Sequence, residues 1–368
     1  MTACPHAGID PFAARVHGPD EPGAPHAALR AAGPVVEVAA PAGGHALVVT
    51  RADLAREVWN HPDLVKDPAW APASWDRTTG VVEPTAAEAP SLSTLDGPAH
   101  LALRRAHAPM FAPRRIRELA AGIEATVREL LAGAGPGEVV DLVPTVTVPF
   151  PATVLLDLVG APRSCLATIV EACAGMQAGD PAAFGSFFAV AGAAVGEGDG
   201  IAAELAGRLD GADPVYQVFS VLFVGQLTTQ PLLGLVLARA LAAPGLAADD
   251  VVEQVLREHP PAPFGLWRFA VRDTSVGGVA VAAGTPVLVD LVSAQQDTEV
   301  TLAFGGGPHV CIGAHLARLE LAAAVRVLRA EYPDARLAVD HDALVARRRA
   351  GTDGSRLDEL PVVLVPAG

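Results

Sequence analysis

The sequence predicts a mainly helical globular fold with a small β region, and three observations carry this prediction. Hydrophobic residues make up 51% of the 368-residue chain, with Ala, Val and Leu most frequent, as in many helical proteins. Residues 215 to 241 form the longest apolar pattern with helical periodicity. Patterns typical of strands are short and lie mainly near the N-terminus. A chain of this length can bury a sizeable core.

The N-terminal part predicts a mixture of short elements. A helical pattern near residues 26 to 32 precedes two strands, at 35 to 38 and at 46 to 50. A short helix follows at 51 to 59, because apolar residues recur there at helical spacing. The span from 67 to 90 is rich in proline and shows no sustained periodicity, so we expect a loop.

The middle of the chain predicts long helices separated by one weakly patterned stretch. Residues 116 to 134 and 150 to 178 have helical periodicity, whereas 179 to 213 are rich in small residues and predict no defined helix. We expect residues 215 to 241 to form a buried central helix rather than a membrane span, because polar side chains interrupt the apolar run. These polar residues are Gln217, Gln226, Thr228, Thr229 and Gln230.

The C-terminal part predicts two strands, one helix and two further short strands. Residues 277 to 297 contain two strand patterns joined by a turn at Gly284. After residue 311, apolar residues recur at the spacing of one helix face, and short strand patterns follow at 344 to 345 and at 361 to 365.

Charge and cysteine content exclude several classes of protein. The formal net charge of −15 argues against nucleic acid as the main partner. The four cysteines lack zinc-like or C-x-x-C spacing, so we expect no disulfide framework and a reducing, cytoplasmic location. They are Cys4, Cys165, Cys173 and Cys311. The N-terminal segment has no basic region followed by an apolar run, so we expect neither a signal peptide nor a membrane anchor.

A glycine-rich loop that turns into a helix is the strongest candidate site. Residues 302 to 320 read LAFGGGPHVCIGAHLARLE, and three consecutive glycines remove side-chain bulk where a large group could approach the backbone. Cys311 lies just before the helical pattern, where free backbone N–H groups favour a thiolate, the form that binds metal. The spacing does not match the dinucleotide fingerprint. The competing interpretation is a small buried cysteine in an ordinary loop.

This loop resembles the haem-binding loop of the cytochrome P450 family. The resemblance rests on the order of six residues before an amphipathic helix, namely Phe304, Gly305, Gly307, His309, Cys311 and Gly313. It implies the mainly helical triangular fold of that family, in one haem-thiolate domain that spans residues 1 to 368. It also implies haem b with Cys311 as the axial iron ligand, and a cofactor site that includes Phe304, Gly305, His309 and Gly313.

Two further passages resemble the segments that bind the haem propionates in this family. His100 and Arg104 lie four residues apart and therefore share one face of a helix. Taken alone, they are as compatible with a solvated polar face, but the passage resembles the family's D-P-P-x-H-x-x-x-R segment. Arg268 resembles its second propionate-binding arginine. Buried carboxylates require charge-assisted donors, which these residues supply.

The central helix resembles the oxygen-binding segment of the family, with one departure. In VGQLTTQ, Gly225 would let the helix lie against the haem and Thr228 would occupy the place of the oxygen-site threonine. The competing interpretation is a helix threonine that bonds to its own backbone. Leu227 replaces the acidic residue that normally assists proton supply, which weakens the case for ordinary oxygen activation.

A second departure concerns the family's E-x-x-R helix. Aligned on Arg257, the glutamate position holds Gln254, and Glu253 points about 100° away around the helix. Most of the loop before Phe304, which usually supplies the second arginine, is absent. We therefore expect Arg257 to be buried and underpaired unless the network has been rebuilt, for example by a Gln–Arg hydrogen bond.

The resemblance implies oxidation of a small specialised-metabolite substrate with O2. Electrons would come from a ferredoxin and a ferredoxin reductase, because the chain shows no flavin or nicotinamide domain. Leu227 keeps a second hypothesis open, namely peroxide-driven oxidation or non-oxygenating haem chemistry such as dehydration or rearrangement. A third is a haem-binding scaffold or helper of a biosynthetic partner protein, against which Cys311 argues. A basic patch would face the ferredoxin, and it consists of Arg105, Arg114, Arg115 and Arg117.

Overall fold

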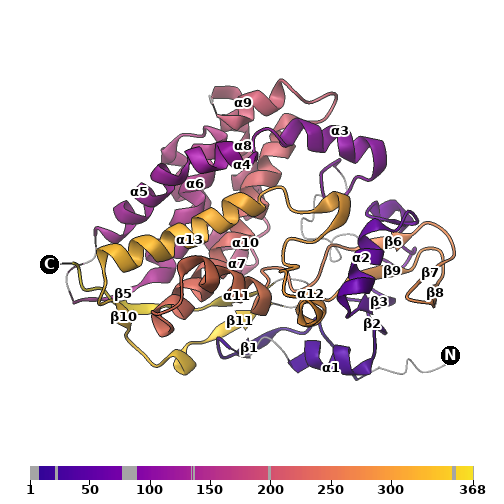
Figure 1. Ribbon diagram of the computed structural model, residues 1–368. Coiled ribbons are helices and arrows are strands. Elements are labelled where there is room, and N and C mark those ends of the chain that lie inside the picture. The colour runs from indigo at the N-terminus through magenta and orange to yellow at the C-terminus, as the bar shows by residue number, and fades with distance from the viewer. Residues whose placement is uncertain are drawn as a thin grey trace. The chain divides into compact units, whose positions relative to one another are not determined.

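The computed structural model describes residues 8–20, 24–76, 89–133, 135, 137–197, 200–349 and 354–367. Cys4 and residues 77–88 of the expected loop lie outside these ranges. The chain forms two compact units, and each collects three segments that are distant in sequence. The first unit holds residues 1–102, 256–311 and 346–355, and the second holds residues 103–255, 312–345 and 356–368. Figure 1 labels the elements in chain order.

The first unit is built on a five-stranded sheet in the order β2-β3-β9-β6-β4. These strands are β2 (Val35–Ala39), β3 (His45–Val49), β9 (Pro286–Val289), β6 (Arg268–Ala270) and β4 (Leu64–Val65). The β2 and β3 strands pair antiparallel, whereas β3 and β9 pair parallel with Leu47 opposite Val287. The sheet therefore joins the N-terminal segment to residues that lie more than two hundred positions later.

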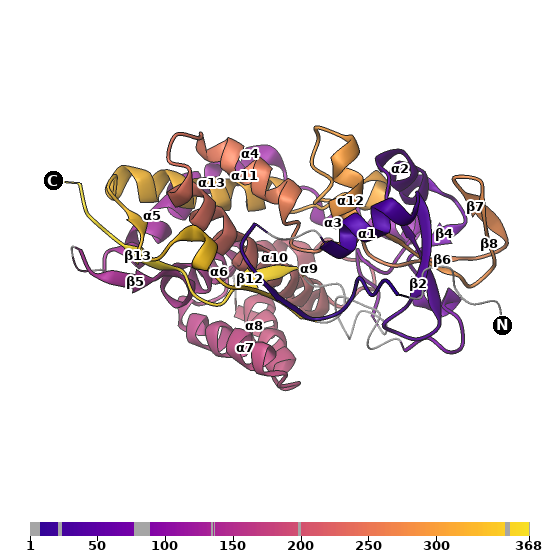
Figure 2. The same ribbon diagram turned by 90° about the horizontal axis from the view of Figure 1, so that it is seen from below.

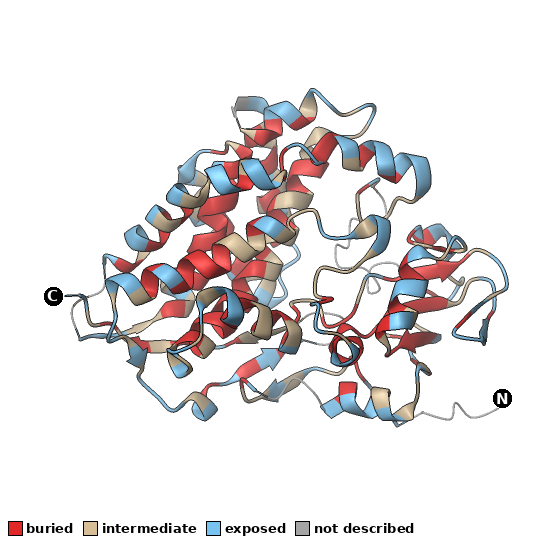
Figure 3. Cartoon of the chain, viewed as in Figure 1, coloured by how far each residue is buried: buried red, intermediate tan, exposed pale blue. Residues whose placement is uncertain are grey.

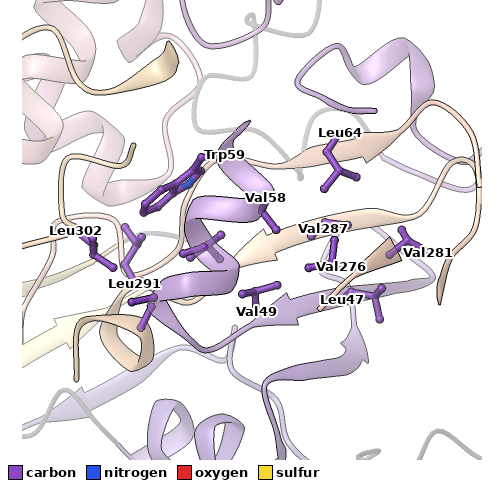
Figure 4. Packing of buried hydrophobic residues seen from close by; sticks show 14 of the residues in the cluster. Leu47, Val49, Val58, Trp59, Leu64, Val276, Val281, Val287, Leu291 and Leu302 are labelled. Carbon is purple, nitrogen blue, oxygen red and sulfur yellow. The ribbon is translucent and has the colours of Figure 1, made fainter. Parts of the chain in front are cut away.

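Helix α2 (Ala52–Asn60) packs on one face of this sheet. Its buried residues are Ala52, Ala55, Val58 and Trp59, which recur at the spacing of one helix face. Figure 4 shows Val58 and Trp59 above the strands that carry Leu47, Val49 and Val287. Alternate residues of the same strands, such as Val48 and Leu288, belong to a second buried cluster, as the two-residue period of a strand requires.

Short elements complete the first unit. Strand β1 (Arg15–His17) pairs antiparallel with β11 (Ala346–Arg348), and β7 (Thr274–Val276) pairs with β8 (Val279–Val281). The first unit also contains three helical segments, namely α1 (Ala24–Ala32), α12 (Leu291–Ala294) and the 3-10 turn Gly307–His309. Helices α3 (Gly97–His107) and α11 (Ala248–Glu258) and strand β12 (Ser355–Leu357) each contain a boundary between the units.

The second unit is helical around α10 (Pro214–Ala242), which is buried along most of its length (Figure 3). The other helices are α4 (Pro113–Glu118), α5 (Ala120–Leu131), α6 (Pro149–Val159), α7 (Leu166–Ala178), α8 (Ala183–Glu197), α9 (Ile201–Ala206) and α13 (Ala314–Glu331). Helices α6, α8 and α13 pack against α10, and α7 lies beside α8 (Figure 2). A small antiparallel sheet joins β10 (Arg336–Leu337), β13 (Pro361–Val363) and β5 (Val139–Asp141).

The structure confirms the mainly helical fold with a small β region, and it corrects three segments. The expectation of no defined helix at 179 to 213 was wrong, because α8 and α9 occupy most of it. Residues 150 to 178 are not one helix, since Gly160 adopts a left-handed conformation (φ 80°) and ends α6. Residues 116 to 134 are likewise divided, between α4 and α5 at Leu119.

Among the described residues, α10 alone is long and apolar enough to cross a membrane. About two thirds (67%) of its most apolar window is buried inside the structure, which is the behaviour of a core helix.

Candidate functional site

The Cys311 loop is held in shape by its own backbone. The Cys311 N–H donates to the Phe304 carbonyl (2.9 Å), and the Gly305 N–H donates to the Leu302 carbonyl (2.8 Å). Cys311 itself is exposed, and Gly313 is the N-cap residue of α13. The predicted arrangement is therefore present: an accessible cysteine on a closed turn, just before a helix.

The glycine run before Cys311 serves this chain's own packing as well as the turn. A Cβ atom on Gly306 would lie 2.3 Å from the Trp59 ring, and one on Gly307 would lie 2.9 Å from the Trp59 carbonyl oxygen. Gly305 has open space at its Cβ position but adopts a φ of +67°, which favours glycine. The glycines were interpreted as room for a large ligand, but at Gly306 and Gly307 the neighbour is α2.

His309 belongs to a cluster of polar side chains in the first unit. Its Nε2 lies 3.0 Å from Asp96 Oδ1, and its Nδ1 lies 3.2 Å from the Leu92 carbonyl oxygen. Its ring stacks against His100, with the ring centroids 4.0 Å apart. His100 is almost fully buried. Two imidazoles from separate segments of the chain thus lie against each other, and one of them, His309, also bonds to a carboxylate.

Arg268 is buried (3% exposed) at the start of β6. Its guanidinium donates to the Leu64 carbonyl (2.8 Å) and to the Trp59 carbonyl (3.3 Å). Burial lowers the pKa of Arg268, and the charge of Asp96 opposes this shift. The neutral acceptors fix the side chain and leave its charge without a direct ion pair among the described residues.

Lys66 is the member of this cluster that the sequence reasoning missed. It is 7% exposed, and its ammonium has no hydrogen-bond or ion-pair partner among the described residues. Burial holds the pKa of Lys66 well below its usual value, Arg268 lowers it further, and Asp96 opposes both. Its only sequence signal is its position directly after the short buried strand β4, because lysine is normally a surface residue.

Asp96 is the one carboxylate beside these cations in the part of the chain that the structure describes. Burial raises the pKa of Asp96, but the hydrogen bonds from His309 and from the Lys66 N–H outweigh burial, so the pKa is lowered overall. The Lys66 N–H donates to Asp96 Oδ2 (2.5 Å). Among the described residues, one negative charge thus faces Lys66, Arg268 and His309, and this donor set fits a ligand that brings additional carboxylates.

The donor set and the unpartnered ammonium fit the propionates of a haem whose iron is bound by Cys311. Arg104 follows His100 by one turn of α3 and is half-buried. Phe304 accepts the hydrogen bond from the Cys311 N–H, so it shapes the loop through its backbone. Cys311, His100, Arg268, His309 and Lys66 all lie in the first unit.

The two predicted residues of α10 have partners within the second unit. The Thr228 hydroxyl donates to the Val224 carbonyl one turn earlier (2.8 Å), which is the self-bonding alternative that the sequence left open. A Cβ atom on Gly225 would meet the Leu155 side chain of α6 at 3.0 Å, so helix packing already accounts for this glycine. Its predicted place beside a haem stays a prediction.

The expectation that Arg257 is buried and underpaired was wrong. Its side chain is 33% exposed, and it forms an ion pair with Glu299 (3.1 Å) in the short segment before Phe304. Glu253, one residue from the family position, instead pairs with Arg318 of α13 (2.5 Å). Arg257 and Glu253 thus each have an ion-pair partner, and the departure from E-x-x-R leaves neither as an unpaired buried charge.

Comparison with known proteins places the chain among bacterial monooxygenases. A scan against models of protein families finds no match. The chain is 36% identical over 420 aligned positions to the cytochrome P-450 monooxygenase DoxA of Streptomyces peucetius subsp. caesius, covering 98% of this chain and 99% of DoxA. It is 31% identical to the cytochrome P450 monooxygenase PikC of Streptomyces venezuelae, covering 87% and 86%.

Solved structures agree with the curated relatives. CYP154C4 from Streptomyces sp. ATCC 11861 superposes with a TM-score of 0.83 at 28% identity, covering 98% of both chains. CYP154A1 from Streptomyces coelicolor A3(2) gives a TM-score of 0.80 at 27% identity, covering 92% of this chain and 96% of that chain. Since the DoxA alignment has more positions (420) than this chain has residues (368), the chain lacks segments that DoxA carries.

The fold, the Cys311 loop and these relatives define a haem-thiolate enzyme. The chain belongs to the cytochrome P450 family. It is accordingly a P450-type monooxygenase, related to bacterial enzymes of secondary metabolism. Membership implies haem with a cysteine thiolate ligand to iron, a small-molecule substrate, and redox partners in general.

Proposed function

We propose that residues 1 to 368 form one functional haem b monooxygenase that oxidises a small specialised metabolite with O2 in the cytoplasm. The carrying observation is the exposed Cys311 on its closed turn, in the same unit as a cationic cluster that has one carboxylate. Bound haem supplies O2 activation at iron, and the Cys311 thiolate donates electron density that favours O–O cleavage.

The chain's residues divide into those that hold the cofactor and those that shape its loop. Cys311 is the iron ligand, and His100, Arg104, Arg268 and His309 hold the propionates. We add Lys66 to this set, because its buried ammonium would gain an anionic partner that no described residue provides by a hydrogen bond or ion pair. Phe304, Gly305 and Gly313 fix the turn through backbone geometry.

Thr228 is the residue that handles protons on the oxygen side. Its O–H donates to the Val224 carbonyl, so its oxygen lone pairs stay available to accept a hydrogen bond from water. Leu227 has no proton to give, so water must take the place of the usual carboxylate. The same residue favours a second function, peroxide-driven oxidation, because peroxide already contains both the oxygen atoms and the two electrons.

The electron donor is proposed to be a ferredoxin that a reductase reduces. Arg105 and Arg117 are exposed in the second unit and are available to an acidic partner. Arg115 is not available to such a partner, because its guanidinium makes two hydrogen bonds to Glu204 (2.6 and 2.9 Å). The basic patch that the sequence predicts therefore loses Arg115 in the structure.

The test compares oxidants in wild type and in a Leu227→Asp variant, with Leu227→Asn as the matched control of similar size. We expect wild-type product with ferredoxin, reductase and NADPH, and a larger fraction of electrons recovered as product in Leu227→Asp but not in Leu227→Asn. Product with hydrogen peroxide but none with ferredoxin, reductase and NADPH would contradict O2 as the oxidant. Failure to take up haem would contradict the whole proposal.

A further inference from the structure

Gln295, directly after α12, is an almost fully buried amide (2% exposed) that uses both ends of its side chain. Its Nε2 donates to the Arg257 carbonyl of α11 (2.9 Å). Its Oε1 accepts from the Thr301 hydroxyl (2.8 Å) and from the Leu302 N–H (2.9 Å). One side chain therefore ties the end of a helix to the short segment that leads into the Cys311 loop.

A continuous path of hydrogen bonds runs from Gln295 to Cys311. Leu302, whose N–H is held by Gln295, accepts through its own carbonyl from the Gly305 N–H (2.8 Å). The next link is the Phe304 carbonyl, which accepts from the Cys311 N–H (2.9 Å). The Leu302 side chain is buried in the core cluster that includes Trp59 and Leu291 (Figure 4). The position of Leu302 therefore limits where Cys311 can lie.

The ion pairs near this path cannot fix the position of Leu302 in the same way. Arg257 forms its ion pair with Glu299. Because the Glu299 side chain is 98% exposed, solvent screens that pair. The Glu253–Arg318 pair is also partly exposed and lies in the second unit. Gln295 is buried, and it bonds to the backbone of both α11 and Leu302.

We propose that Gln295 is the positioning residue of the Cys311 loop. One neutral amide thus replaces the ion-pair network that the family resemblance leads one to expect at this place. The amide is required chemically, because only a group with both a donor and an acceptor satisfies the Arg257 carbonyl and the Leu302 N–H together. The inference rests on the proposed role of Cys311 as iron ligand.

Three variants separate this role from general stability. Gln295→Glu keeps the shape and the acceptor but loses the donor, and Gln295→Leu loses both. Thr301→Val, at similar volume, removes the hydrogen bond to Gln295 and a longer one that Thr301 accepts from the Ala303 N–H (3.3 Å). Gln296→Glu is the matched control, because Gln296 is the exposed neighbour in the same turn. Amide hydrogen exchange at Cys311 in the apoprotein is the first measurement, and the fraction of thiolate-type carbon monoxide complex in the haem-loaded protein is the second.

We expect Cys311 exchange about tenfold faster or more in Gln295→Leu and Gln295→Glu, a smaller increase in Thr301→Val, and none in Gln296→Glu. The thiolate-type fraction should fall in the same order. The proposal would be overturned if folded Gln295→Glu or Thr301→Val had the wild-type rate of Cys311 exchange and the wild-type fraction of thiolate-type complex. It would also be overturned if these variants lowered only the melting temperature and changed neither of those two quantities. If wild type itself lacks the thiolate-type spectrum, the proposed function fails, while the exchange measurement still decides the role of Gln295.

Discussion

Lys66 places an ammonium group in a nearly closed environment, where it has no hydrogen-bond or ion-pair partner among the described residues. Such a group costs free energy in the cofactor-free protein, because it has lost water and gained nothing in return. An anionic ligand reverses the balance, since the same ammonium then makes a charge-assisted hydrogen bond. In the proposed function, Lys66 therefore lowers the stability of the cofactor-free protein and raises its affinity for the cofactor.

Replacing Lys66 with methionine should change these two quantities in opposite directions. In Lys66→Met, we expect the free energy of unfolding of the apoprotein to rise by about 1–3 kcal/mol, because an unpaired buried charge is removed. Haem affinity should fall roughly tenfold or more, because a charge-assisted bond is lost. Urea unfolding measures the first quantity and transfer of haem to an acceptor protein measures the second.

Haem dimethyl ester is the control for this prediction, since it has no carboxylates. Its affinity should be nearly the same in wild type and in Lys66→Met. A variant that binds native haem as tightly as wild type would show that Lys66 does not contact the propionates.

Glu320, in α13, is a buried carboxyl of the second unit. Its side chain is 2% exposed, and burial raises its pKa well above the usual value of 4.5. As pH rises through the unfolded value, the unfolded chain loses this proton first, while the folded protein keeps it. Stability therefore falls with rising pH, by up to about 1.4 kcal/mol per pH unit, until the folded pKa is reached.

Glu320→Gln should remove this dependence. We expect the variant to match wild type below about pH 4.5 and to have a larger free energy of unfolding at neutral pH. Urea unfolding of the apoprotein at several pH values tests this, with the exposed residue Glu171→Gln as control. An identical pH dependence in wild type and in Glu320→Gln would contradict the buried, protonated state.

At the scale of elements, two neighbouring glycines of the Cys311 loop have different structural requirements. Gly306 has an extended backbone (φ −160°) but no room for a Cβ beside Trp59. Gly305 has room but needs a positive φ. The same substitution therefore acts by steric overlap at one position and by backbone strain at the other.

Alanine at these positions should separate the two effects. Gly306→Ala should cost about 1–3 kcal/mol of stability through overlap with the ring, and Gly305→Ala about 1–2 kcal/mol through strain. Combining each with Trp59→Leu in a double-mutant cycle should recover most of the Gly306→Ala cost and none of the Gly305→Ala cost. Equal recovery, measured by urea unfolding, would contradict the assignment.

Elements with a clear apolar face could be predicted from the sequence, and elements buried on several sides could not. The patterns of α2, α10 and α13 gave their positions to within a few residues. Helices α8 and α9 were missed, because small residues dominate that stretch and α8 packs against both α7 and α10. No polar face was left to reveal the helical period.

Within the candidate site, motif residues could be predicted, while residues that act through burial could not. Cys311, His309, His100 and Arg268 follow from the resemblance, and three of them meet in one cluster of the structure. Lys66 and Gln295 belong to no motif. They stand out because they are buried from solvent and because of the hydrogen-bond partners around them, and only the folded chain defines both.

At the scale of the whole molecule, the chain is a P450-type monooxygenase whose cofactor loop is well preserved and whose supporting residues have changed. Leu227 is proposed to alter proton supply, Arg257 pairs with an exposed carboxylate, and Gln295 bonds to the backbone from a buried position. The loop with Cys311 therefore carries the central claim, and the oxidant and substrate depend on residues further from it.

The spectrum of the reduced protein under carbon monoxide tests that claim most directly, with wild type and Cys311→Ser purified and loaded with haem in parallel. The wild type should give the red-shifted Soret band of a thiolate-bound iron, and Cys311→Ser should lose that band while it retains some haem. A haem-loaded wild type without the red-shifted band would contradict Cys311 as the iron ligand.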